Sequence, residues 1–259
     1  MTQFASEVRK VATTWTWWVV LLGMVAYSAC YTAFMVIASR LERSPLDLGS
    51  AESAVIVYNM PVAIAYVFPL AMGVVLVTQE YRSKLISQTL LANPSRWSVY
   101  GAKAVTGLAV GLLYGLVTVL ACTGAAGGLL AAMGEPAYLG SGPVLQAVLG
   151  SVAVLTLWGL IGVGVGALIR NQLVAVVGVV VLTQFIEPVF RLAGTGLGGD
   201  DVTWLLPGGA GDAAAGGTAL NTMTGTAAGG QLPGFAMLGV YAAVFGALGA
   251  WRFARYEIS

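Results

Sequence analysis

The sequence contains six apolar stretches that are each about long enough to cross the hydrocarbon core of a lipid bilayer as a helix. A crossing helix needs roughly 20 predominantly apolar residues, and runs of this length are too long for the helices of soluble domains. We therefore predict an all-α integral membrane protein in which residues 1–259 form a single transmembrane domain. The six spans cover about residues 15–39, 54–78, 104–133, 143–169, 173–190 and 233–251.

The composition agrees with this class and excludes several functions. Of the 259 residues, 58% are hydrophobic and 9% are charged, whereas soluble domains carry roughly 25% charged residues. A net charge of +1 provides no basic field for a nucleic acid. The sequence has no histidine, and its two cysteines, Cys30 and Cys122, lie inside apolar stretches. We expect no catalytic, cofactor or metal site in this chain.

Two regions outside the spans are expected to form further helices. Near the amino terminus, Phe4, Val8 and Val11 recur at helical spacing, which predicts a helix lying in the headgroup layer. The stretch between the fifth and sixth spans is too rich in glycine to be helical throughout. Short helices are expected there at residues 204–207 and 211–223, outside the membrane.

Residues 79–103 form the longest charged segment between two apolar stretches. Drawn as a helix, the first half places Tyr81 and Leu85 on one side and Glu80 and Lys84 on the other, which predicts an amphipathic helix on a membrane surface. Glu80 and Lys84 are four residues apart, in the order that favours an ion pair. The second half of the segment limits and redirects the helix.

Pro94 stops the amphipathic helix, because its ring disfavours helical conformation at Asn93 and removes an amide donor. Ser95 is placed to cap a second helix that begins at Arg96 and enters the third span. Pro94 therefore sets an elbow between the two helices.

The distribution of basic residues predicts the orientation of the spans. With the amino terminus in the cytoplasm, the outer loops contain only Arg40, Arg43 and Arg191. This asymmetry obeys the positive-inside rule, so both termini and the segment 79–103 are expected in the cytoplasm. The remaining basic residues are then inside: Arg9, Lys10, Arg82, Lys84, Arg96, Lys103, Arg170, Arg252 and Arg255.

The segment resembles the membrane subunit of type-2 ABC exporters. The resemblance lies in Glu80 after the second span, the amphipathic helix, the run Leu90-Leu91-Ala92-Asn93-Pro94-Ser95-Arg96-Trp97 and Lys103 at the third span. It departs from many relatives, which carry Gly-Thr where this chain has Lys84-Leu85. Over the rest of the chain the resemblance is a generic six-span topology.

This resemblance implies a bacterial cell-membrane permease subunit that works as a homodimer or heterodimer and exports a substrate. The segment would be the cytoplasmic coupling element that docks on a separate ATPase subunit, where ATP and Mg²⁺ would bind. Type-2 permeases transport drugs, lipids, glycans and peptides, so the resemblance does not identify the substrate. The expected coupling residues are Glu80, Tyr81, Arg82, Lys84, Leu85, Pro94 and Arg96.

The sequence contains no nucleotide-binding motif that would argue against a separate ATPase subunit. Residues 194–199 spell GxGxxG, but they follow a membrane span rather than a β-strand and open no βαβ unit. The sequence contains no GxxxxGK[ST] motif. Energy for uphill transport would therefore come from another subunit. Pro94→Leu, or charge reversal at Glu80, is predicted to uncouple ATP hydrolysis from export while the protein stays inserted.

Polar residues within the spans have two interpretations. One is a substrate path between two protomers, and the other is a set of interhelical hydrogen bonds. For Glu187 a charge pair with Arg191, four residues later, is a further alternative. Gly107, Gly111 and Gly115 form a smooth stripe for helix packing, within the subunit or at a subunit interface. The candidate path residues are Tyr58, Asn59, Tyr66, Gln184 and Glu187.

Two other classes of function compete with an ABC permease. A proton- or ion-coupled secondary transporter would be expected to carry acidic residues within its spans, where only Glu187 qualifies, at an edge. An intramembrane enzyme would need paired carboxylates or histidines in its spans. The sequence favours the permease over both.

Overall fold

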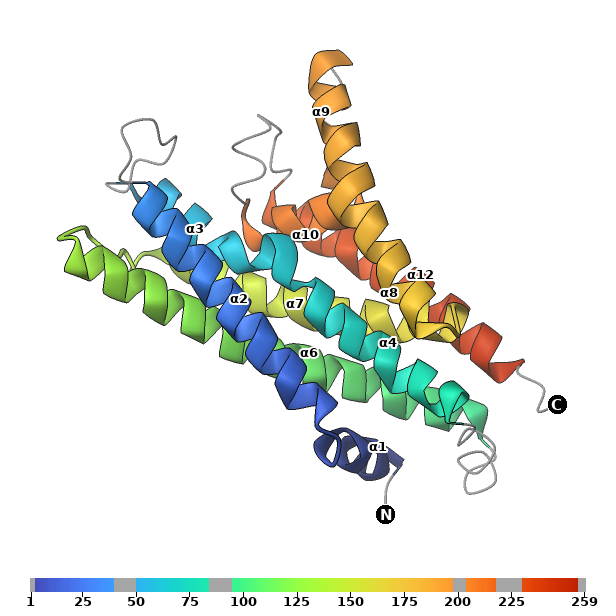
Figure 1. Cartoon of the computed structure of the whole chain (residues 1–259). Helices are drawn as coiled ribbons and strands as arrows, with labels where there is room; N and C mark the ends of the chain where they lie inside the picture. Colours follow the sequence, from blue (N-terminus) through green and yellow to red (C-terminus); the bar gives the residue numbers. More distant parts are fainter. Residues whose placement is uncertain (1–2, 40–49, 84–94, 198–203, 218–229, 256–259) are drawn as a thin grey trace.

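The computed structural model describes residues 3–39, 50–83, 95–197, 204–217 and 230–255, and these residues form helices and no strand (Figure 1). Six of the helical segments are long and apolar enough to cross a membrane. The predicted all-α, multi-pass architecture is confirmed at this level. The six segments are Thr16–Ala38, Ser53–Arg82, Arg96–Ala132, Gly142–Leu168, Gln172–Arg191 and Gln231–Ala254.

The second span consists of two helices, α3 (Ala51–Ala65) and α4 (Val67–Arg82), that meet at Tyr66. Pro69 explains the break, because it has no N–H with which to bond the carbonyl of Ala65 four residues earlier. The kink that the prolines of this span predict is therefore present.

The third span is the single helix α6 (Arg96–Ala132), which packs against α2 (Thr16–Ala38) and α4. Its 37 residues extend over roughly 55 Å at 1.5 Å per residue, well beyond the roughly 30 Å of bilayer hydrocarbon. The Ser95 hydroxyl accepts a hydrogen bond from the Ser98 amide at 3.4 Å, so the predicted cap is confirmed.

Helix α7 (Gly142–Leu168) is the centre of the bundle and packs against α3, α4, α6 and α12 (Gln231–Ala254). Glycines allow these helices to approach closely. A Cβ atom on Gly162 would collide with the backbone of Leu70 in α4, and one on Gly164 would collide with the backbone of Phe245 in α12. The close approach of α7 to its neighbours therefore requires glycine at both positions.

The fifth span is formed by α8 (Gln172–Val181), a π-helical turn (Leu182–Ile186) and α9 (Glu187–Leu197). Pro188 lacks the N–H that would bond the Gln184 carbonyl, which accounts for the wider turn before it. This rod lies at the side of the bundle, and α9 projects past the other helices (Figure 1). Its outward face is apolar, as expected for a surface in contact with lipid or another membrane helix: Leu173, Val177, Val181, Phe185 and Val189 are exposed.

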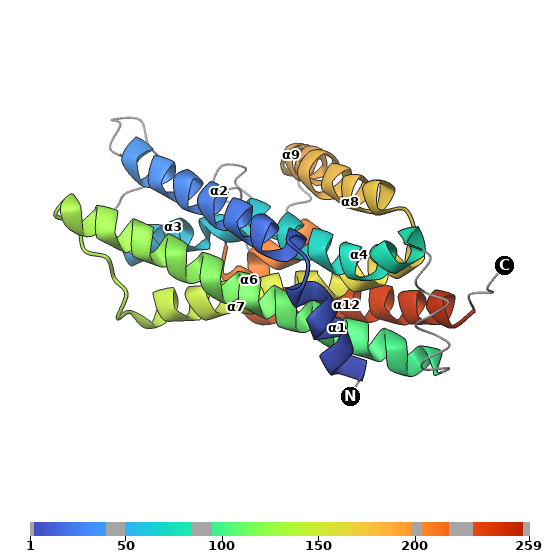
Figure 2. The same cartoon turned by 60° about the horizontal axis from the view of Figure 1, so that its bottom comes forward.

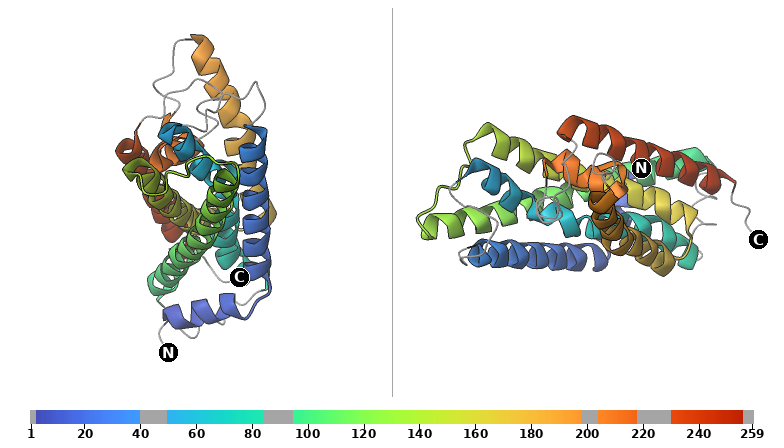
Figure 3. Two further views of the ribbon diagram at one scale, coloured as in Figure 1. Left: turned by 90° about the vertical axis from the view of Figure 1, so that its left-hand side faces the viewer. Right: turned by 90° about the horizontal axis from the view of Figure 1, so that it is seen from above.

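Two short helices complete the described part of the fold. Helix α1 (Gln3–Ala12) lies across α6 (Figure 2) and crosswise to α2 (Figure 3). Helix α10 (Pro207–Ala215) packs among α3, α7 and α12. It begins four residues before the predicted start at residue 211, because Pro207 suits a first helical turn, and it ends before Gly216, whose φ is +101°.

Candidate functional site at the α1, α4 and α6 end

Four charged side chains from three helices meet at one end of the bundle. The Lys10 ammonium group lies 2.6 Å from the carboxylates of both Glu7 and Glu80. The Lys103 ammonium group lies 2.8 Å from Glu7 and 2.9 Å from Glu80. We call Glu7, Lys10, Glu80 and Lys103 the four-charge cluster. It ties α1 to the last turn of α4 and to the first turns of α6.

Most of the four-charge cluster is buried. Lys103 is 0% exposed, Glu7 is 1% exposed and Glu80 is 5% exposed. Two positive and two negative charges cancel, and Lys103 also donates a hydrogen bond to the Leu76 carbonyl at 3.1 Å. Since a buried charge is costly unless it is paired and hydrogen-bonded, the four side chains depend on one another.

Lys10 is the solvent-facing member of the four-charge cluster, with 46% of its side chain exposed. Partial burial lowers the pKa of Lys10, but hydrogen bonds and charge from Glu7 and Glu80 outweigh that effect and raise the pKa above its ordinary value. Lys10 therefore keeps its charge to a higher pH than an isolated lysine would.

The position of Glu80 corrects the sequence interpretation. Glu80 was expected on the exposed face of an amphipathic helix, paired with Lys84, but it belongs to α4 and faces the bundle interior, one turn after buried Leu76. Lys103 and Lys10 are its partners among the described residues. Of the other expected coupling residues, Lys84, Leu85 and Pro94 lie outside the described residues.

The remaining coupling residues lie at the described ends of α4 and α6. The guanidinium of Arg170 lies over the Tyr81 ring, 5.5 Å from its centroid. Arg96 donates a hydrogen bond to the Ala254 carbonyl at 2.8 Å, which joins the start of α6 to the end of α12. Arg82 is exposed. The carboxyl-terminal end of α12 therefore lies at the same end of the bundle as α1.

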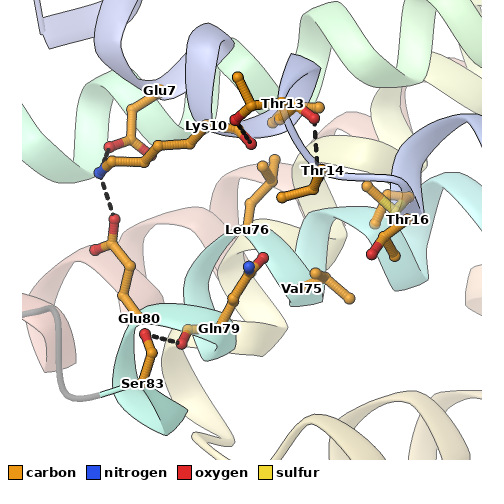
Figure 4. Close-up of a pocket in the computed structure, with 12 residues that line it drawn as sticks. Glu7, Lys10, Thr13, Thr14, Thr16, Val75, Leu76, Gln79, Glu80 and Ser83 are labelled. Carbon is orange, nitrogen blue, oxygen red and sulfur yellow. Dashed lines mark hydrogen bonds and ion pairs between the residues drawn. The ribbon is translucent and has the colours of Figure 1, made fainter.

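A cavity of about 330 Å³ opens beside the four-charge cluster, between α1 and α4 (Figure 4). Glu7, Lys10 and Glu80 form its charged wall, and Val75 and Leu76 form part of its apolar wall. The cavity leaves the ammonium group of Lys10 accessible. Three threonines and two further polar residues complete its polar lining: Thr13, Thr14, Thr16, Gln79 and Ser83.

A second buried group of charges lies toward the other end of the bundle. Arg191 lies 3.6 Å from Glu187 and 2.7 Å from Asp212 on α10, and all three residues are at most 4% exposed. The expected Glu187 to Arg191 ion pair is present. Asp212 was missed by the sequence analysis; the signal was a single acid in a run of small apolar residues, which requires a partner.

Helix α10 is held at both ends by side chains from other helices. The Glu187 carboxylate accepts hydrogen bonds from the amides of Gly208, at 2.9 and 3.0 Å, and Gly209, at 3.3 Å, where the helix dipole favours negative charge. The buried Asn59 amide donates to the carbonyls of Ala215 and Gly217 at 2.8 and 2.9 Å. These contacts fix α10 against α3 and α9.

The remaining candidate path residues also make hydrogen bonds inside the chain. Tyr58 donates to the Ala137 carbonyl at 2.8 Å. Gln184 donates to the Tyr66 hydroxyl at 2.7 Å and to the Ala63 carbonyl at 3.2 Å. None of the five residues lines the cavity beside the four-charge cluster. The Gln184 bonds agree with the second interpretation, interhelical hydrogen bonding, whereas the Tyr58 bond reaches the connection between α6 and α7.

Gly107, Gly111 and Gly115 face α7 within the same chain. A Cβ atom on Gly111 would lie 2.8 Å from the Thr156 carbonyl oxygen, and one on Gly115 would lie 3.1 Å from the Val152 carbonyl oxygen. The stripe therefore brings the backbones of α6 and α7 together inside the subunit.

Within the described ranges, no three His, Cys, Asp or Glu side chains gather in a way that could hold a metal ion. Comparison of the chain with protein-family models, with curated proteins and with solved structures gives no match. The fold defines a multi-pass membrane protein with six helices suited to span the bilayer. Any narrower functional class is therefore inferred from the side-chain contacts described above.

Proposed function

We propose that the chain is the membrane-spanning permease subunit of an ATP-driven exporter, coupled to a separate cytoplasmic ATPase and paired with a second permease protomer, either identical or different. The spans would lie in a bacterial cell membrane with both termini in the cytoplasm. The alternative class is an ion-coupled secondary transporter.

The observation that carries the proposal is the way the four-charge cluster joins the helices on either side of residues 84–94. Glu80 lies close before that segment and Lys103 close after it, and both contact α1 through Lys10 or Glu7. A push on the segment by a partner protein would therefore move α4, α6 and α1 together. Helix α6 contains no proline and can carry the displacement along its length.

A second candidate, proton-coupled transport, is favoured by one observation. Glu187, Arg191 and Asp212 are buried together, and ionisable groups within membrane proteins commonly mark ion pathways. Against it, each of these charges already has a partner in the chain, and Glu187 also caps α10. We rank this function second.

The test is ATP-dependent transport by the chain in the presence of its ATPase. The chain is purified from its host together with the proteins that copurify. ATP hydrolysis is then measured in liposomes for the wild-type chain and for the Pro94→Leu variant. The permease proposal predicts copurification of a protein with a GxxxxGK[ST] motif, and export that continues when a protonophore removes the proton gradient at constant ATP. Export that stops with the gradient would support the secondary transporter.

A further inference from the structure

A second cavity, of about 820 Å³, lies between α2, α4 and α8. This volume falls within the range of roughly 300–1,000 Å³ that is usual for ligand sites. The cavity borders the one beside the four-charge cluster, since Thr16, Met72 and Val75 line both. Its wall differs in charge from the wall of that cavity, because it has no acidic residue among the described ones.

The charge on the wall of this cavity is positive. Arg82 and Arg170 line it, and no acidic residue does so within the described part of the chain. Arg82 is exposed and forms no ion pair with a described side chain. The Arg170 guanidinium is positioned over the Tyr81 ring. Two guanidinium groups at one mouth can form charge-assisted, bidentate hydrogen bonds with a phosphate.

On all three helices, the wall of the cavity is polar at the end of the bundle that carries Arg82 and becomes apolar toward the middle of the bundle. Polar residues come first on α2 and α8, where Thr16 precedes Val20 and Gln172 precedes Val176. On α4 the order runs from Arg82 to Ala71, about 16 Å along the helix. The cavity therefore has a cationic mouth at the end of the bundle and an apolar interior. The apolar lining residues are Val20, Ala71, Met72, Val75, Leu173 and Val176.

We propose that this cavity binds an anionic phospholipid from the surrounding leaflet. Arg82 and Arg170 hold the headgroup phosphate, and an acyl chain lies along α4 toward Ala71. Basic pockets between membrane helices bind anionic headgroups in this way, and an apolar chain adds favourable burial of its methylene groups. The site requires the chain to be in a bilayer, but it does not depend on ATP-driven export.

The test uses the full chain in nanodiscs of phosphatidylcholine that contain a phosphatidylglycerol with a photoactivatable acyl chain. After illumination, labelled residues are mapped by mass spectrometry. The proposal predicts labelling near Ala71, Val75 and Val176 that unlabelled phosphatidylglycerol displaces and extra phosphatidylcholine does not. Displacement by inorganic phosphate at equal concentration would overturn it in favour of a site for a soluble anion.

Matched variants separate a specific site from general attraction to a negative surface. Arg82→Gln with Arg170→Gln removes two charges at the mouth, and should reduce labelling roughly tenfold or more. Arg252→Gln with Arg255→Gln removes two charges at the end of α12, and should change labelling less than about twofold. Equal loss in both pairs would overturn the proposal.

A third variant keeps both arginines and fills the interior. Val75→Phe with Val176→Phe occupies the apolar part of the cavity, and labelling should fall while the thermal melting temperature of the purified protein is retained. Unchanged labelling in this variant would show that no acyl chain enters the cavity. If wild-type nanodiscs give labelling only outside these three helices, the cavity has another occupant, such as a second copy of the chain.

Discussion

The ammonium group of Lys103 lies 2.8 Å from the carboxylate of Glu7, and this ion pair joins the amino-terminal helix α1 to the start of the longest span. Both side chains are almost fully buried. Helix α1 is therefore part of the charged interior of this end of the bundle. It would move with α6 if the end of the bundle were displaced.

Replacing Lys103 with methionine should destabilise the protein. The substitution keeps much of the side-chain volume. Among the described residues it leaves Glu7 and Glu80 with the half-exposed Lys10 as their one cationic partner. Removing one member of a buried ion pair costs about 3–5 kcal/mol. The measurement is the thermal melting temperature in detergent, with Arg252→Met at an exposed position as the control. Equal melting temperatures for the two variants would contradict the burial of Lys103.

Charge reversal at Glu80 should impair folding, which changes the hypothesis made from the sequence. Glu80→Lys would place a third cation beside Lys10 and Lys103 in a buried site. The yield of monodisperse protein should fall sharply. Normal yield of this variant would instead place Glu80 in water. Pro94→Leu is the cleaner test of coupling.

Glycines on opposite faces of α6 should respond to alanine in opposite directions. At Gly111 a new Cβ would press on the backbone of Thr156 in α7, whereas at Gly124 it would meet no atom of the described residues within 4 Å. We expect Gly111→Ala to destabilise by about 1–3 kcal/mol. Gly124→Ala should stabilise by up to about 1 kcal/mol, because alanine is the better helix former. Thermal or denaturant unfolding in detergent measures both, and equal effects would rule out close packing at Gly111.

Removing the Asn59 amide should loosen α10. Asn59→Leu deletes the bonds to the carbonyls of Ala215 and Gly217 and leaves these buried groups unsatisfied, at about 1–3 kcal/mol each. Hydrogen exchange of the α10 amides should become roughly ten times faster or more. Tyr58→Phe is the control, because it loses a bond to Ala137 and leaves α10 untouched. Similar exchange in both variants would mean that α10 is held by other contacts.

The raised pKa of Lys10 predicts a stability change at high pH. A lysine whose pKa is higher in the folded state stabilises the fold fully below its unfolded value, roughly 10.4. That contribution is lost as the pH rises through the folded value. The wild-type protein should therefore lose more stability than Lys10→Met above about pH 10.4, measured by thermal melting. Parallel curves for the two proteins would indicate that Lys10 gains nothing from Glu7 and Glu80.

The six spans, the Ser95 cap and the kink in the second span could be predicted from the sequence, because each depends on local properties. Apolar length marks a membrane helix, Ser95 precedes a helix, and Pro69 breaks one. Residues 84–94 were expected to form most of the amphipathic helix, and they lie outside the described residues.

The tertiary role of Glu80 could not be found by drawing its local stretch as one helix. The side of the helix that carries Glu80 is set by packing of α4 against α6 and α7, which begins a turn earlier at Leu76. A global signal was available: Lys103 at the start of an apolar span needs an acidic partner, and Glu7 and Glu80 were two of the few acids expected on that side. Asp212 and Arg191 offered the same kind of signal.

Photo-crosslinking from residues 84–94 in living cells tests the proposed coupling most directly. A photoactivatable amino acid replaces Ser87 in the full chain, cells are illuminated, and captured proteins are identified by mass spectrometry. The account predicts capture of a cytoplasmic ATPase that carries a GxxxxGK[ST] motif, and loss of export in Pro94→Leu cells in which the ATPase is still captured. Labelling of position 87 by a membrane-impermeant reagent added outside the cell, with no ATPase captured, would contradict it.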